Sequence, residues 1–209
     1  MKSLRYESKE EWLAARRGKI TGSRLKDIIV KRGTGKKIGF YELIAERLGI
    51  PADTDENPMD RGTRLEPEAI ARFEAETGKK VDTSLVLWMR EDSDHIAVSP
   101  DGFIETGKGK KKAITEAVET KCLGSARHIE AYLTQEIPDE YKMQALQYFI
   151  VNDKLETLHF VFFDPRLVSK DYFVIPVHRA AVQEEVDSYL EYQHATLAEV
   201  EAIVTQLSF

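Results

Sequence analysis

Several features that mark other classes of protein are absent or scarce in this sequence. Cys122 is the only cysteine in 209 residues, so one chain can form neither an internal disulfide nor a thiolate zinc site. No apolar run approaches the roughly 18 residues that a membrane-spanning helix requires. No phosphate-binding Gly-x-x-x-x-Gly-Lys-Ser/Thr segment is present, and the five histidines lack zinc-site spacing. We therefore expect a protein of the reducing cytoplasm, without a membrane partner and without ATP-driven movement.

Charge is unevenly distributed along the chain. The 30 basic and 36 acidic residues give a formal net charge of −6. Residues 1–40 hold twelve basic and four acidic side chains, a net +8, whereas residues 41–209 hold 18 and 32, a net −14. This asymmetry indicates a local surface for an anion, although a solvated pair of basic helices gives the same count. The acidic total argues against nonspecific coating of nucleic acid, because that mode needs broad neutralisation of phosphates.

Hydrophobic periodicity predicts a mixed α/β fold in which helices flank a sheet. No linker or repeat interrupts residues 1–209, so we expect a single domain. Helices are expected at residues 8–17, from about 21, and at 40–48, 66–77, 139–151 and 180–205. Strands are expected at residues 84–90, 95–98, 113–122, 158–163 and 172–177. Residues 52–60 are expected to form a polar loop, and Asp101-Gly102 a turn.

The segment Val118-Glu119-Thr120-Lys121-Cys122 carries the strongest chemical signal. On a strand, Glu119 and Lys121 share one face, and the positions between them share the other. The stretch Ser99-Pro100-Asp101-Gly102 is expected to end a strand that pairs with this one, which would bring Asp101 beside both. Two carboxylates and a lysine suit a hydrolytic Mg²⁺ site, because hard oxygen ligands hold the ion and leave waters for substrate. An exposed charged face fits the same residues, so the pattern alone leaves both interpretations open.

These two segments together resemble the PD-(D/E)xK nuclease motif and, more narrowly, the phage lambda exonuclease and YqaJ-like viral recombinase family. Three further segments resemble the same family in the same order: Trp12 to Ser23, Arg61 to Glu66, and Tyr141 to Tyr148. Each motif alone is weak, and the ordered set over residues 12–148 is specific. The resemblance implies a restriction-endonuclease-like core, with a central mixed β-sheet flanked by helices and extra helices at both ends.

The resemblance also implies a metal-dependent exonuclease that acts on the ends of double-stranded DNA. Asp101 and Glu119 would bind Mg²⁺, for which Mn²⁺ is expected to substitute, with the backbone carbonyl of Thr120 as a third ligand. Lys121 would position and activate the attacking water. Glu66 matches a helical glutamate that supports a second metal or its water shell. The alternative for Glu66 is an acid favoured by the helix dipole in a first turn.

Recognition of the 5′-terminal phosphate is implied for four polar residues, namely Arg16, Ser23, Ser99 and Gln147. Arginine offers a bidentate fork to phosphate, and Ser23 lies where a helix N-terminus would present free N–H groups. The alternatives are a surface position for Arg16 and a plain N-cap for Ser23. Gln144 lies one turn before Gln147, and either can be the matched glutamine; we choose Gln147 because Tyr148 follows it. Met59 matches an apolar residue that helps separate the terminal base pair, or else packs in the core.

The sequence therefore predicts an Mg²⁺-dependent 5′→3′ exonuclease that digests one strand of duplex DNA to mononucleotides. The remaining 3′ overhang would serve a phage-type single-strand annealing protein in a bacterial host, and the family resemblance implies a ring-shaped homotrimer. Two alternatives remain: a structure-specific or restriction-type endonuclease with the same fold, and a DNA-end-binding module that has lost catalysis. The acidic C-terminal helix would face a partner, a neighbouring subunit or only solvent.

Overall fold

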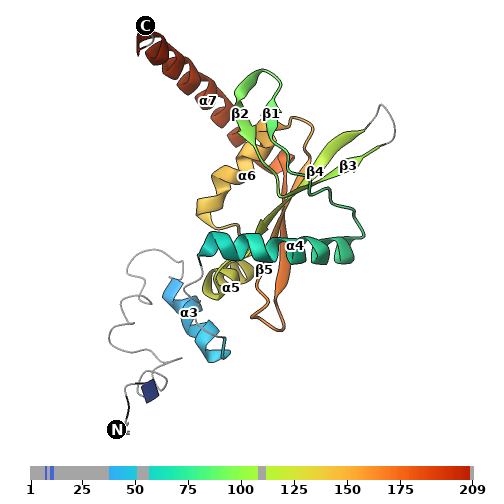
Figure 1. Ribbon diagram of the computed structural model, residues 1–209, viewed down its shortest axis with the longest axis vertical. Helices are drawn as coiled ribbons and strands as arrows, with labels where there is room; N and C mark the ends of the chain where they lie inside the picture. The colour runs from blue at the N-terminus through green and yellow to red at the C-terminus, as the bar shows by residue number, and fades with distance from the viewer. Residues whose placement is uncertain (1–7, 9, 12–37, 51–56, 108–111, 208–209) are drawn as a thin grey trace.

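A four-stranded mixed sheet forms the centre of the computed structural model, which describes residues 8, 10–11, 38–50, 57–107 and 112–207 (Figure 1). The strand order is β3-β4-β5-β6, with β4 and β5 parallel and the two outer pairs antiparallel. The strands are β3 (Gly102–Thr106), β4 (Ala113–Lys121), β5 (Thr157–Phe163) and β6 (Tyr172–His178). A separate two-stranded sheet pairs β1 (Trp88–Arg90) with β2 (Ser93–Val98).

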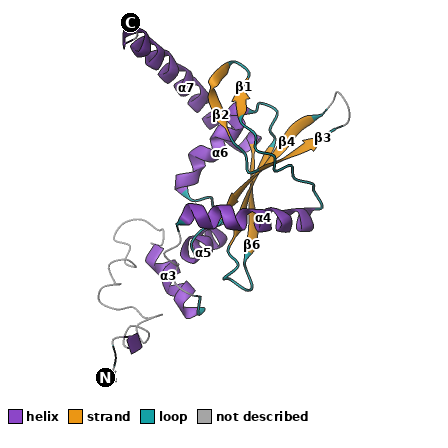
Figure 2. Ribbon diagram, viewed as in Figure 1, coloured by secondary structure: helices purple, strands orange, loops and turns teal. Residues whose placement is uncertain are grey.

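Helices cover both faces of the central sheet (Figure 2). On one face, α4 (Pro58–Thr77) packs against β4 and β5. On the other lie α6 (Asp139–Val151) and α7 (Arg179–Leu207), and α7 extends outward from the sheet. The pair α3 (Ile38–Arg47) and α5 (Ser125–Thr134) pack against each other near one end of α4. In the described part of the chain, no helix combines the length and apolar character needed to cross a bilayer.

Side chains of the sheet alternate between two hydrophobic clusters. Ala117 and Phe160 belong to the cluster that contains α6, whereas Val118 and Val161 belong to the cluster that contains α4. These residues are all fully buried, and the burial of each large side chain contributes about 1.5–3 kcal/mol. The alternation fixes which face each residue of β4 presents, and therefore which helix can reach it.

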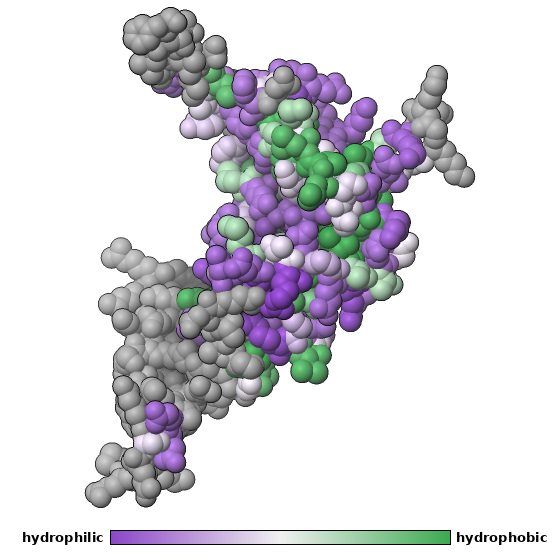
Figure 3. Space-filling model, viewed as in Figure 1, coloured by the Kyte–Doolittle hydropathy of each residue, from purple (hydrophilic) through white to green (hydrophobic). Residues whose placement is uncertain are grey.

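Some apolar side chains remain at the surface. Leu85, Leu87 and Met89 are exposed in the segment that leads into β1 and in β1 itself. Figure 3 shows apolar side chains gathered in this part of the visible face, with hydrophilic side chains around them.

The expected mixed α/β class is confirmed, and so are most of the expected elements. The helices expected at residues 40–48, 139–151 and 180–205 correspond to α3, α6 and α7. The strands expected at residues 95–98, 113–122, 158–163 and 172–177 correspond to β2, β4, β5 and β6. The expected helix from about residue 21 lies outside the described residues. Most of the helix expected at 8–17 does too, although the Glu11 N–H donates to Ser8 Oγ at 3.1 Å.

The structure differs from the expected helices and strands in three places. The helix expected at residues 66–77 begins at Pro58, because Asn57 Oδ1 accepts the Met59 N–H at 3.0 Å and proline suits a first turn. Residues 58–60 are therefore helical, not part of a polar loop. The strand expected at 84–90 covers only 88–90, and α5 was not expected at all.

The expected turn at Asp101-Gly102 is also wrong, since Gly102 begins β3. The strand that pairs with β4 therefore follows Asp101, and β2 pairs with β1 instead. A glycine is needed at this point because a Cβ on Gly102 would lie 2.4 Å from Cγ1 of Val81. Phe103 forms a backbone bridge to Asp82, which holds the two segments at this distance.

Replacing Gly102 by alanine is expected to destabilise the protein by about 1–3 kcal/mol, because the buried Val81 must move to admit the methyl group. Urea unfolding measures the change. Gly62 in α4 is the matched control, since a Cβ there meets nothing within 4 Å. Gly62→Ala is expected to stabilise the helix by up to about 1 kcal/mol. Equal unfolding midpoints for both variants would contradict the close approach of β3 to Val81.

Candidate active site

Glu119 and Lys121 lie on the face of β4 that α6 covers. The Glu119 side chain is 3% exposed and that of Lys121 14%, so the interpretation as an exposed charged face is wrong. Lys121 Nζ lies 2.5 Å from Glu119 Oε1 and 4.6 Å from the centre of the Tyr141 ring. The carboxylate and the aromatic face together hold the ammonium group in place.

Asp101 lies between β2 and β3 and is tied to β4 through Thr120. Its Oδ2 accepts the Thr120 backbone N–H at 2.7 Å and the Thr120 hydroxyl at 2.9 Å. Because Gly102 pairs with Val118, the residue before Gly102 lies alongside the C-terminal end of β4. The structure thus places Asp101 next to the Glu119-Thr120-Lys121 segment, which is the juxtaposition that the sequence motif requires.

Two residues of α6 complete the surroundings of Glu119. Gln144 Nε2 donates to Glu119 Oε1 at 2.7 Å, and the buried phenol of Tyr148 donates to Glu119 Oε2. Sequence reasoning assigned neither contact. A signal was present, because Tyr141, Gln144 and Tyr148 have i, i+3, i+7 spacing and therefore share one face of a helix.

The carboxyl groups of the site repel one another. Burial and then the charge of Asp101 raise the pKa of Glu119, while Lys121 and the Tyr148 phenol oppose the rise. Burial raises the pKa of Glu66 as well, followed by the charges of Asp101 and Glu119, so α4 brings Glu66 within electrostatic range. Burial and the charge of Glu119 raise the pKa of Tyr148 far above its ordinary value, which keeps the phenol protonated as a donor.

The donor set fits a magnesium ion that retains several waters. A carboxylate has about four lone-pair positions, and the three donors described above occupy three of those on Glu119. Among the described residues, Asp101 Oδ1 has no hydrogen-bond donor. Mg²⁺ is commonly held by one or two carboxylates and water. Within the described ranges, no three His, Cys, Asp or Glu side chains form a ligand group, so Glu66 is coupled to the pair without joining it.

The structure describes two of the four residues that were expected to bind the 5′-phosphate. Arg16 and Ser23 lie outside the described residues. Ser99 is exposed, directly before Pro100 and Asp101. Gln147 points away from Glu119: its Nε2 donates to the Ala97 carbonyl at 3.2 Å, and its amide pairs with that of Gln193. Gln144, the alternative that the sequence left open, contacts Glu119, and the choice between the two glutamines as the phosphate ligand stays a prediction.

Two other residues are placed clearly. Met59 is 76% exposed in the first turn of α4, which excludes packing in the core. Cys122 is buried, and burial raises the pKa of its thiol to about 12. A protonated, buried thiol is a poor nucleophile, so Cys122 is a structural residue, as its position on the opposite face of the strand indicates.

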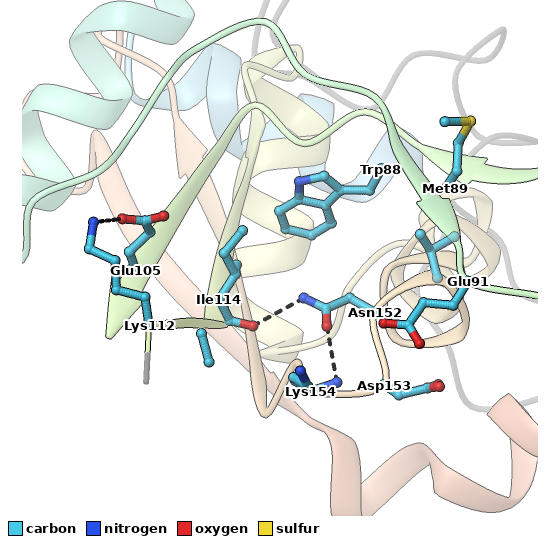
Figure 4. A pocket seen from close by; sticks show the side chains of 11 residues that line it. Trp88, Met89, Glu91, Glu105, Lys112, Ile114, Asn152, Asp153 and Lys154 are labelled. Carbon is cyan, nitrogen blue, oxygen red and sulfur yellow. Dashed lines mark hydrogen bonds and ion pairs between the residues drawn. The ribbon is translucent and has the colours of Figure 1, made fainter. Parts of the chain in front are cut away.

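A hollow of about 610 Å³ lies apart from these groups, between β1, the β3–β4 hairpin and the end of α6 (Figure 4). Trp88, Ile114 and Asn152 are among its lining residues, and Asp101, Glu119 and Lys121 are not. The Asn152 side-chain amide donates to the Ile114 carbonyl at 3.0 Å, so this polar group is already satisfied within the protein.

The mixed sheet, with Pro100-Asp101 beside Glu119-Thr120-Lys121, is the arrangement expected of a PD-(D/E)xK nuclease fold. Comparison with known proteins gives the family. A family model, the YqaJ-like viral recombinase domain, matches residues 11–155, and the chain belongs to this family. The expected family relationship is thereby confirmed.

Two crystal structures are similar to the chain over nearly its whole length. Both are of LHK-Exo, described as an alkaline exonuclease from Laribacter hongkongensis, and one is in complex with dAMP. Each is 30% identical in sequence, with 95% of this chain and 100% of that chain covered, at a TM-score of 0.54. The comparison with curated proteins finds no match.

Gln144→Ala is expected to slow DNA hydrolysis about tenfold to a hundredfold, because it removes a hydrogen bond that orients Glu119. Loss of a group that orients a metal-binding side chain typically has an effect of this size. Gln147→Ala is the matched variant on the same helix. It is expected to lower the free energy of unfolding by about 1–2 kcal/mol, since it breaks the contacts to Ala97 and Gln193, with a smaller effect on hydrolysis. Rate assays and urea unfolding of both variants test this, and the opposite ranking of rates would support the choice of Gln147.

Proposed function

We propose that the chain is a divalent-metal-dependent 5′→3′ exonuclease that digests one strand of duplex DNA from an end. It would release mononucleotides and leave a 3′ overhang for recombination by single-strand annealing. The observation that carries the proposal is the convergence of Asp101, Glu119 and Lys121 at one end of β4. Family membership and the likeness to an alkaline exonuclease support the reaction class.

The proposed roles follow from the contacts of each side chain. Asp101 and Glu119, with the backbone carbonyl of Thr120, would hold Mg²⁺ or Mn²⁺. Such an ion polarises a phosphodiester and lowers the pKa of bound water. Lys121 would position and activate the attacking water from the place that Glu119 and Tyr141 give its ammonium group. Glu66 would support a second ion or its waters, because it lies close enough for the charges of Asp101 and Glu119 to raise its pKa.

Recognition of the DNA end is the second part of the proposal. Arg16, Ser23 and Ser99 would contact the 5′-phosphate, together with an amide of α6, for which the contacts favour Gln144 over Gln147. The net +8 of residues 1–40 supports an anion-binding role for this part of the chain. LHK-Exo binds dAMP in one crystal structure, and a nucleoside monophosphate is the class of product proposed here.

We further propose a ring-shaped homotrimer around the DNA and cooperation with a phage-type annealing protein. A ring keeps the enzyme on its substrate without strong phosphate attraction, which reconciles DNA digestion with a net charge of −6.

Incubation with 5′-phosphorylated linear duplex DNA is expected to release mononucleotides in the presence of Mg²⁺ and to stop when the metal is chelated. Lys121→Ala and Asp101→Asn are expected to lower the rate at least about 100-fold, because each removes a group placed at the reacting phosphate. Release of acid-soluble nucleotides measures the reaction, and circular dichroism confirms that the variants are folded.

Covalently closed circular DNA separates the alternatives in the same assay. An end-dependent exonuclease leaves it intact, whereas cleavage of the circle would indicate the endonuclease. No hydrolysis of either substrate and no uptake of Mn²⁺ by the folded wild-type protein would indicate a DNA-end-binding module.

Arg16→Ala is expected to abolish the preference for a 5′-phosphate over a 5′-hydroxyl end. The preference itself is expected to be about 10- to 100-fold, since a hydrogen bond to a charged group contributes about 1.5–3 kcal/mol. Initial rates on the two substrates measure it. Arg17→Ala is the matched control of equal charge and is expected to keep the preference; loss in both variants would point to general attraction of the DNA, not to an end-specific contact.

A further inference from the structure

The phenol of Tyr148 contacts the carboxylate of Glu119 and also the backbone of Asp101. Tyr148 is fully buried in α6, and its hydroxyl donates to Glu119 Oε2. Glu119 Oε1 receives Lys121 at 2.5 Å and Gln144 at 2.7 Å, so the two oxygens have different partners. Among the described residues, Tyr148 supplies the one side-chain donor to Oε2.

We propose that Tyr148 is a positioning residue, which fixes the rotation of the Glu119 carboxylate so that Oε1 meets Lys121 and the remaining lone pair is free for the metal. This inference rests on the proposed function. Without the phenol, the carboxylate of Glu119 keeps donors on one oxygen alone and can turn about its last torsion, which is broad for glutamate.

The surroundings of the phenol ring favour a fixed donor. The Trp88 ring packs edge-on against that of Tyr148 at 6.2 Å and 85°, and Tyr148 belongs to the larger hydrophobic cluster with Phe149 and Phe160. A ring held on several sides cannot swing, so its hydroxyl presents a constant direction to Glu119.

A second buried phenol shows that the fold tolerates a tyrosine hydroxyl without a partner. Tyr172 Oη on β6 is buried and has no hydrogen-bond partner among the described residues. Tyr172 packs at the edge of the cluster that contains α4, on the face of the sheet opposite to Glu119. The two tyrosines thus form a matched pair: within the described part of the chain, the hydroxyl of Tyr148 has an acceptor and that of Tyr172 has none.

Tyr148 acts through Glu119 and does not contact DNA itself, because none of its surface is accessible. Its loss should therefore lower metal affinity and kcat while KM for DNA ends stays unchanged. A role in packing alone would instead lower stability and leave the metal affinity of the folded protein as it was.

The experiment compares full-length wild type, Tyr148→Phe and Tyr172→Phe. Mn²⁺ binding is measured by calorimetry, kcat and KM by nucleotide release from 5′-phosphorylated duplex, and folding by circular dichroism. We expect Tyr148→Phe to bind Mn²⁺ about 10- to 100-fold more weakly and to lose kcat by a similar factor. Tyr172→Phe is expected to match the wild type in both. Tyr148→Met, which also lacks the donor but fills the site flexibly, replaces Tyr148→Phe if that variant does not fold.

A double-mutant cycle identifies the route of the effect. In a Glu119→Asp background the shortened carboxylate no longer reaches the phenol, so adding Tyr148→Phe is expected to change kcat less than twofold. An equal loss of kcat in both backgrounds would overturn the positioning role. So would wild-type Mn²⁺ affinity and kcat in Tyr148→Phe, and in that case the proposed function would stand. Absence of both Mn²⁺ uptake and DNA hydrolysis in the wild type would overturn the function and the inference together.

Discussion

The burial of one carboxylate, that of Glu119, constrains the rest of the structure. A carboxylate that is 3% exposed loses most of its hydration, and the interior must replace it with hydrogen-bond donors. Lys121 on the same strand supplies one, and Gln144 and Tyr148 on α6 supply two more. The strand and the helix must therefore keep a fixed register, because a displacement of one residue would exchange donors for apolar side chains.

Strand β4 meets this constraint because alternate residues face different helices. Its odd positions turn Glu119 and Lys121 toward α6, and its even positions turn Val118 and Thr120 toward α4. Thr120 also binds Asp101, since both its backbone N–H and its hydroxyl donate to the Asp101 carboxylate. The polar groups of the site thus occupy the end of the strand, while Ala117 and Val118 just before them are packed on the two faces.

The sequence predicted β4, α6 and the shared face of Glu119 and Lys121, because each depends on a local period in the chain. It did not predict that Gly102 begins a strand, since an Asp-Gly pair favours a turn and the decisive contact is with Val81, 21 residues earlier in the chain. The choice between Gln144 and Gln147 depends on tertiary structure in another way. Both lie on the buried side of α6, and only the orientation of that helix over β4 shows which glutamine reaches the carboxylate.

The proposed divalent cation would balance the charges at the site. Asp101, Glu119 and Glu66 carry three negative charges when ionised, and Lys121 returns one positive charge. Burial and then mutual repulsion raise the pKa of both glutamates, so ionisation of these two groups costs stability as pH rises above their ordinary range. A doubly charged ion at the open oxygens of the acidic pair would cancel the excess of two charges. The repulsion that disfavours the ionised carboxylates would then become attraction for the metal, provided that hydrogen bonds hold Glu119 in one orientation.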